Sequence, residues 1–90
     1  MEKFTIAERY TNENETPIQV GDKIKVFPTE EWKLQGLKLK DEYLEEYGGA
    51  FLKVEDIKHD NGIFFYTCST VDSEIVPILF VDSDIKYVLR

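Results

Sequence analysis

The fold is decided by the stretch Ile57-Lys58-His59-Asp60-Asn61-Gly62-Ile63-Phe64-Phe65-Tyr66. Within it, Asn61-Gly62 supplies the two residues with positive φ that a type I′ turn needs. Residues that favour β structure flank this pair on both sides, as they do in tight hairpins. The sequence therefore predicts an antiparallel hairpin at the centre of the chain, with arms over residues 51–57 and 63–70.

A second, half-buried strand is predicted after a turn or bulge at Gly21-Asp22. In this segment Ile24 and Val26 alternate with Lys23 and Lys25. Successive side chains of a strand point to opposite faces. One face of this strand is therefore expected to be buried and the other to be wet.

The rest of the chain, outside the segment 28–48, is expected to add short strands and loops. Further strands are predicted over residues 4–7, 75–81 and 85–89. Pro77 has no backbone N–H to donate, which places its strand at an edge or a bulge. A turn at Ser83-Asp84 precedes the last strand, and the polar residues 11–17 are expected to form an exposed loop.

Two short helices are predicted in the segment after Phe27. The first is expected to start within Pro28–Trp32, where Thr29 can act as its N-cap and Glu30 and Glu31 suit its positive end, and to stop at Gly36 after Gln35. The second is expected over residues 41–47, with Gly48 at its C-terminal end. A helix this short is marginal by itself, so it is expected to dock its aromatic side on the sheet.

The stretch Val20-Gly21-Asp22-Lys23-Ile24-Lys25-Val26 resembles the first strand of SH3-like small barrels, including KOW and Tudor modules. Where those modules place a Gly-rich loop, this chain has Pro28-Thr29-Glu30-Glu31-Trp32 instead. Their ligand-binding residues are therefore not carried over. The resemblance implies only a strongly bent sheet of five or six strands that is used for binding.

These features predict one mainly β domain over residues 1–90. We expect a small antiparallel, partly open SH3-like barrel of about six strands, with one or two short inserted helices. An α+β roll is the alternative. Hydrophobic residues form 42% of the chain and charged residues 32%, which is typical of a globular protein.

The cellular location is predicted from what the sequence lacks. No run approaches the roughly 18 apolar residues that span a bilayer. The first residues lack the basic and apolar regions of a secretory signal. Cys68 is the single cysteine, so no intrachain disulfide can form. Together these points favour a cytoplasmic protein that does not bind a membrane.

The net charge of −7 bears on the class of partner. The acidic residues of the protein are spread over the whole chain, so there is neither an acidic tail nor a basic arm. Such a field repels phosphates over most of the surface and disfavours nucleic acid as a partner. It serves solubility, or it attracts a partner with a basic surface.

The residues for nucleophilic catalysis are too few and too far apart. His59, the only histidine, is expected near the hairpin tip in solvent. Cys68 is expected on the same face of its strand as Phe64 and Tyr66, where it behaves as a small apolar residue. The hairpin register can bring His59 near Phe64 but not near Cys68. We therefore expect no catalytic residues, no enzyme activity and no cofactor.

Carboxylate pairs are abundant, which lowers the information in each. They occur at Glu30/Glu31, Asp41/Glu42, Glu45/Glu46, Glu55/Asp56 and Asp82/Asp84. A small enzyme that uses one such pair remains a further hypothesis, which needs a deep pocket and an acid with a raised pKa. The Asp82-Ser83-Asp84 stretch lacks the glycine and closing Glu of an EF-hand loop, so no metal site is predicted.

The sequence favours a non-enzymatic module that binds another protein. The expected binding surface is the acidic and aromatic insertion, formed by Glu30, Glu31, Trp32, Tyr43, Glu45, Glu46 and Tyr47. The partner would have a basic surface. One version is an inhibitor or adaptor of the phage or mobile-element type that acts on a basic nucleic-acid-binding protein. A homodimer formed by pairing of strand edges is also left open.

The alternative is a barrel that binds nucleic acid through an exposed aromatic face. Its rings would come from Trp32, Tyr43, Tyr47, Phe51, Phe64 and Tyr66. These residues are otherwise expected to fill the core. A stacking surface also needs a basic groove, so Lys33, Lys38, Lys40 and Lys53 would have to converge around exposed rings.

Overall fold

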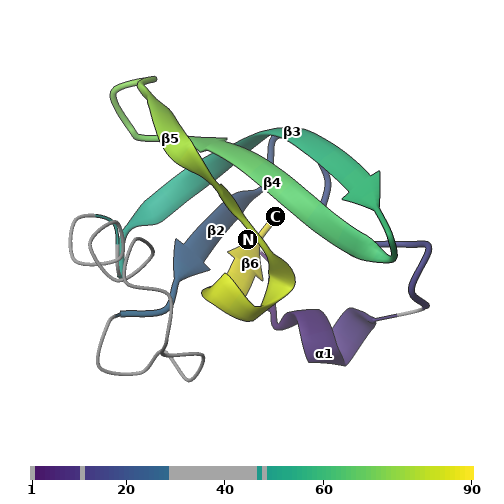
Figure 1. The fold of residues 1–90 in the computed structure, drawn as a ribbon. Helices are drawn as coiled ribbons and strands as arrows, with labels where there is room; N and C mark the ends of the chain where they lie inside the picture. Colours follow the sequence, from purple (N-terminus) through teal and green to yellow (C-terminus); the bar gives the residue numbers. More distant parts are fainter. Residues whose placement is uncertain (1, 11, 29–46, 48) are drawn as a thin grey trace.

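A computed structural model describes residues 2–10, 12–28, 47 and 49–90. These residues form one six-stranded antiparallel sheet in the order β1-β6-β2-β3-β4-β5 (Figure 1). The strands are β1 (Lys3–Phe4), β2 (Lys23–Val26), β3 (Phe51–Asp60), β4 (Ile63–Ser69), β5 (Ile75–Phe80) and β6 (Ile85–Leu89). The helical elements that lie wholly within the described residues are α1 (Ile6–Arg9) and a 3₁₀ turn at Asp82–Asp84. The prediction of a mainly β antiparallel domain of about six strands is confirmed.

The central hairpin forms as its turn residues require. Asn61 and Gly62 have φ values of 50° and 77°, the positive values of a type I′ turn. Pairing starts beside the turn at Asp60 and Ile63 and continues through His59 and Phe64. The arm before the turn is longer than predicted, because the ladder extends all the way to Asp60.

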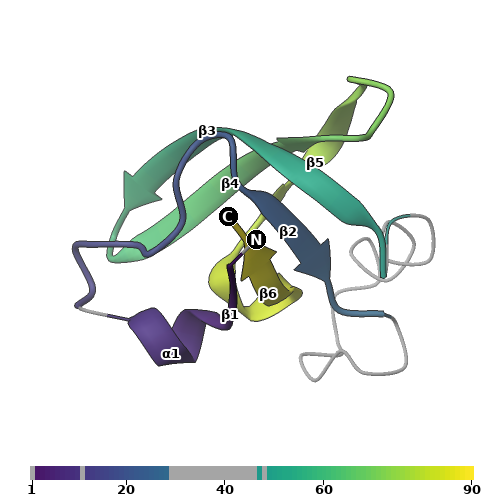
Figure 2. The same cartoon turned by 180° about the vertical axis from the view of Figure 1, so that it is seen from behind.

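The sheet is strongly bent and open. Register shifts interrupt the ladders between Lys25 and Val26, between Val54 and Asp56, and between Thr67 and Ser69. Each such irregularity increases the local twist and bends its strand, and Figures 1 and 2 show the resulting curvature. The edge strands β1 and β5 do not pair with each other in the described sheet, so the barrel stays partly open as predicted.

The core occupies the inner face of this bent sheet. Ile24 and Val26 of β2 are fully buried, while Lys23 is exposed and Lys25 half-buried, which confirms the predicted alternation. The remaining core positions are Phe4, Ile18, Leu52, Val54, Phe64, Tyr66, Cys68, Val76, Phe80, Ile85 and Val88. Cys68 shares the buried face of β4 with Phe64 and Tyr66, as predicted.

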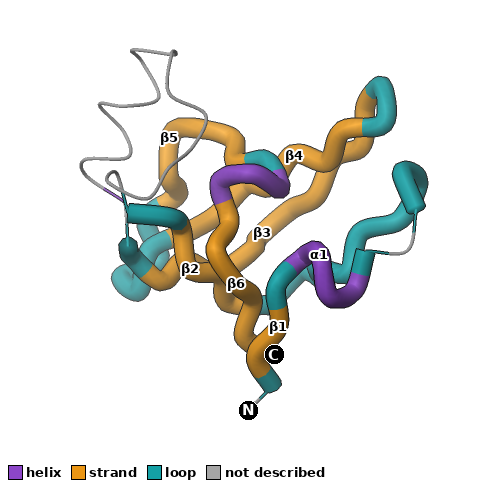
Figure 3. The backbone as a smooth tube through the Cα atoms, turned by 90° about the horizontal axis from the view of Figure 1, so that it is seen from below, coloured by secondary structure: helices purple, strands orange, loops and turns teal. Residues whose placement is uncertain are grey.

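The edge and turn predictions in the C-terminal part are also confirmed. In the described sheet β5 pairs only with β4, so Pro77 lies in an edge strand, in the span where the register shifts between the pairs Thr67–Leu79 and Ser69–Ile75. The chain then turns at Asp82–Asp84 into β6. Figure 3 shows β6 between β1 and β2, so the last strand lies inside the sheet, next to the edge strand β1.

The predicted opening strand over residues 4–7 is wrong. β1 ends at Phe4, and α1 follows at once. Thr5 and Glu8 form a capping box: Thr5 N donates to Glu8 Oε2 at 2.7 Å, and Glu8 N donates to Thr5 Oγ1 at 3.3 Å. The Thr-x-x-Glu spacing that starts helices was therefore present in the sequence. The two inserted helices predicted after Phe27 lie almost entirely outside the described residues.

Candidate anion-binding face

The outer face of the sheet collects lysines and aromatic rings from neighbouring strands. Since Ile24 and Val26 point into the core, Lys23 and Lys25 lie on the outer side of β2. Lys25 pairs with Phe51 on β3 and Tyr87 on β6. The next row joins Lys23 to Lys53 and Leu89, and Leu89 pairs in turn with Lys3 on β1. We call this surface the lysine face; it consists of Lys3, Lys23, Lys25, Phe51, Lys53, Tyr87 and Leu89.

Aromatic rings hold two of these lysines in place. Lys3 Nζ lies 4.1 Å from the centre of the Tyr87 ring, and Lys25 Nζ lies 5.0 Å from the centre of the Phe51 ring. The two rings meet edge to face at a centroid distance of 6.1 Å. An ammonium group over a ring face is attracted by the ring quadrupole. The face therefore presents positive charges directly beside aromatic surface.

The other two lysines form a like-charged pair. Lys23 and Lys53 are directly opposite each other on β2 and β3, and both are exposed. Among the described residues, neither has a carboxylate within ion-pair distance. Like charges in this position destabilise a sheet, whereas an acid opposite a lysine would stabilise it. A protein with 18 acidic residues nevertheless has two lysines here.

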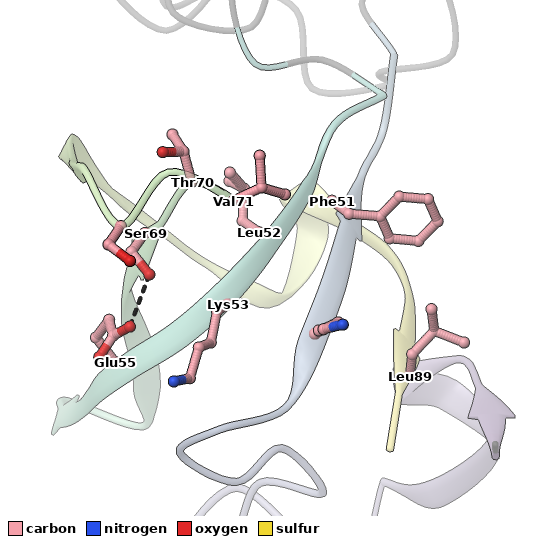
Figure 4. A pocket seen from close by; sticks show the side chains of 10 residues that line it. Phe51, Leu52, Lys53, Glu55, Ser69, Thr70, Val71 and Leu89 are labelled. Carbon is pink, nitrogen blue, oxygen red and sulfur yellow. Dashed lines mark hydrogen bonds between the residues drawn. The ribbon is translucent and has the colours of Figure 1, made fainter.

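A pocket of about 500 Å³ opens beside this pair. It lies between β3, the adjoining ends of β2 and β6, and the turn that joins β4 to β5. In Figure 4, Phe51 and Leu89 lie on one side of β3, and Ser69, Thr70 and Val71 lie on the other. The pocket combines two ammonium groups, hydroxyl groups and apolar walls.

Glu55 is the only acid among the described residues that line this pocket. The buried Ser69 hydroxyl donates a hydrogen bond of 2.7 Å to Glu55 Oε1 (Figure 4). Burial chiefly, and the charge of Glu55 secondarily, raise the pKa of the neighbouring Cys68 thiol to about 12. Cys68 therefore keeps its proton at neutral pH and is not a thiolate nucleophile.

The register separates His59 from Cys68, as predicted. His59 is exposed and lies opposite Phe64, and the two rings stack with centroids 4.2 Å apart. The ring atom Nε2 is 3.1 Å from the carbonyl oxygen of Glu13, so this histidine connects the hairpin to the 12–17 loop. Cys68 lies opposite Val54 instead.

Several acids that the sequence presents as pairs have structural roles. Tyr66 OH donates to Asp82 Oδ1 at 2.6 Å and lies 2.7 Å from Thr16 Oγ1, while burial raises the pKa of Tyr66 well above its usual range. Asp84 is fully buried and accepts a 2.9 Å hydrogen bond from the backbone N–H of Val81. Within the described ranges, no three His, Cys, Asp or Glu side chains gather as a metal site would require.

The predicted acidic and aromatic insertion falls almost wholly outside the described residues. This applies to Glu30, Glu31, Trp32, Tyr43, Glu45 and Glu46. Only Tyr47 is described, and it is half-buried and packs against the core. Phe64 and Tyr66, which the nucleic-acid alternative required on the surface, are buried, so that part of the alternative is wrong.

The lysine face was missed by sequence reasoning, although part of its signal was visible. The alternation of Lys23 and Lys25 marked the solvent side of β2. Only the register shows that Lys53 and Lys3 join them, since these residues are distant in sequence.

No family model, curated protein or solved structure matches this chain. Its resemblance to SH3-like modules therefore stays a prediction. Among the described residues, no helix has the length and apolar character needed to cross a bilayer.

Proposed function

We propose that this protein is a non-enzymatic interaction module that binds an acidic segment of another protein on the lysine face. One observation carries the proposal: four lysines from β1, β2 and β3 converge on one side of a protein with a net charge of −7. Two of them, Lys23 and Lys53, oppose each other without a described counter-ion. A partner carboxylate would relieve that repulsion.

Several contacts would have to act together. An exposed ion pair contributes only about 0–1 kcal/mol, so one lysine cannot hold a partner. The face also offers apolar contact from Phe51, which is 40% exposed, and from the half-buried Tyr87 and Leu89. An acidic segment with interspersed apolar side chains complements both features.

A protein segment fits the face better than a nucleic acid does. Bases stack on free ring faces in a basic groove. Here lysine ammonium groups lie over the Phe51 and Tyr87 rings, and the overall negative charge opposes a polyphosphate chain. Lys53 does lie beside an exposed ring, which keeps the nucleic-acid alternative testable. Lys33, Lys38 and Lys40, which it also required, lie outside the described residues.

The predicted partner with a basic surface stays a separate prediction, because it depends on the insertion around Trp32. A cytoplasmic location is part of the present proposal. It is supported by the single cysteine, Cys68, which has no second cysteine to form an intrachain disulfide.

The test is a binding titration with a labelled peptide of alternating Glu and Leu, followed by fluorescence anisotropy. We expect binding that weakens as salt is raised, and no binding of the matching Gln-Leu peptide. Lys53→Glu should weaken binding about tenfold, because one attraction is replaced by a repulsion. Lys58→Glu is the matched control: Lys58 is exposed on the same strand, outside the lysine face, and its reversal changes the net charge equally.

Three results would contradict the proposal. The first is no binding of the Glu-Leu peptide at low salt. The second is an equal loss in Lys53→Glu and Lys58→Glu, which would show a general charge effect rather than a site. The third is tighter binding of a single-stranded oligothymidine, which would favour the nucleic-acid alternative.

A further inference from the structure

The geometry points to the pocket beside Lys23 and Lys53 as the anchor site for one Asp or Glu of the bound segment, together with an adjacent large apolar side chain. This inference rests on the proposed function and specifies the group that its central site selects. Three features of the pocket support it: its charge, the position of its own acid, and its apolar rim.

The charge of the pocket matches one carboxylate. Lys23 and Lys53 contribute two positive charges, and Glu55 contributes one negative charge. One partner carboxylate would bring this group of charges to neutrality. A phosphate group, with a charge near −2 at neutral pH, would leave excess negative charge beside Glu55.

The pocket holds its own acid away from its lysines. Glu55 accepts the 2.7 Å hydrogen bond from Ser69, a side chain that is only 2% exposed. It makes no ion pair within 4 Å with Lys53 or Lys23 in the described structure. Ser69 therefore keeps Glu55 from neutralising the pocket, and the ammonium groups stay available to a ligand.

The rim of the pocket supplies an exposed apolar contact. Val71 is 86% exposed, at the turn between β4 and β5. The turn is held by Thr70, whose Oγ1 accepts from Glu74 N at 3.3 Å and whose carbonyl oxygen accepts from Ser73 N at 2.9 Å. Leu89, Phe51 and Leu52 add to the apolar lining. This arrangement suits an apolar residue next to the bound carboxylate.

The first experiment compares three versions of the alternating Glu-Leu peptide, which carry Glu, Gln or phosphoserine at one central position and are otherwise identical. We expect the Glu peptide to bind at least about fivefold more tightly than either of the others. Val71→Ser should weaken binding of the Glu peptide about threefold, because it removes apolar contact at the rim. Val20→Ser is the control, since Val20 is 60% exposed and lies outside the pocket.

The second experiment tests the position of Glu55. Glu55→Gln should raise the affinity for the phosphoserine peptide more than that for the Glu peptide, because it makes the pocket more positive. Ser69→Ala should weaken binding of the Glu peptide, since Glu55 is then free to approach Lys53. If Ser69 acts only through Glu55, the double variant Ser69→Ala/Glu55→Gln should bind the Glu peptide as tightly as Glu55→Gln alone. A purely structural role of Ser69 predicts instead that Ser69→Ala weakens binding as much beside Glu55→Gln as it does in the unmodified protein.

The outcomes separate this inference from the proposed function. If the Glu-Leu peptide binds and Lys25→Glu weakens it, but the Val71 and Ser69 variants do not, the module stands and the pocket is not its anchor. A preference for the phosphoserine peptide over the Glu peptide in the unmodified protein overturns the carboxylate assignment. If no peptide binds, the proposed function fails and this inference fails with it.

Discussion

The two faces of β2 differ in burial and in the charges around them, although their residues alternate along one strand. On the inner face, Ile24 and Val26 are fully buried in the core. On the outer face, Lys23 is exposed opposite Lys53, with no carboxylate of the described structure in ion-pair distance. The gain in stability from burying apolar side chains explains the residues of the inner face. It does not explain two lysines opposite each other on the outer face, and a local feature that opposes stability is typical of a binding site.

The largest effect is expected from breaking the inner face. Ile24→Ala should lower the free energy of unfolding by about 2–5 kcal/mol, because it removes buried apolar atoms and leaves a cavity. Urea denaturation measures the change. Lys25→Ala in the same strand is the control and should cost less than about 1 kcal/mol, the value of an exposed contact with the Phe51 ring. Equal losses would contradict the distinction between the faces.

The next largest effect is expected from raising the pH, which should lower the free energy of unfolding through the buried Cys68. Burial raises the pKa of Cys68 from 9.0 to about 12, so the unfolded chain releases this proton at lower pH than the folded protein does. The stability due to the protonated thiol is therefore complete below pH 9.0 and is lost as the pH rises towards about 12. The slope is at most about 1.4 kcal/mol per pH unit.

Cys68→Ala isolates this contribution. The variant will be less stable at every pH because of the smaller side chain, so the slope rather than the level is the measured quantity. A shallower fall of unfolding free energy above pH 9.0 is expected in the variant than in the unmodified protein. Identical slopes would show that the buried thiol does not titrate differently on folding.

The outer face should respond in the opposite sense. Lys53→Glu places an acid opposite Lys23, so the protein should be unchanged or up to about 1 kcal/mol more stable while its binding is weakened. Thermal or urea unfolding measures the first quantity and the peptide titration the second. A large loss of stability would contradict the view that this pair is retained for binding. It would make Lys53 part of the structural framework.

The smallest effect is expected from the control position on the outer surface. Lys58→Glu should change the free energy of unfolding by less than about 0.5 kcal/mol, which is usual for exposed substitutions. It should also leave peptide affinity within about twofold. A loss of binding as large as that of Lys53→Glu would indicate a general charge effect instead of a site on the lysine face.

The sequence predicted the features whose cause is local. Asn61-Gly62 marks the hairpin because positive φ is a property of those two residues, and it was found in the structure. The alternation in β2 and the edge position of Pro77 follow equally from single-residue chemistry. Thr5 and Glu8 show the limit of prediction from local sequence. Their spacing is that of a capping box at a helix start, but the β-forming residues around Thr5 predicted a strand there instead.

The lysine face was decided only by the tertiary structure. Its rows depend on a register that pairs β2 with β3 across a long intervening segment, and on the insertion of β6 between β1 and β2. No local pattern shows that Lys23 faces Lys53 or that Lys3 lies over Tyr87. The sequence by itself thus determined most of the strands, the hairpin turn and the buried face of β2, since these follow from periodicity and backbone preference. The site depends on which strands become neighbours, and that was decided when the whole sheet formed around one core.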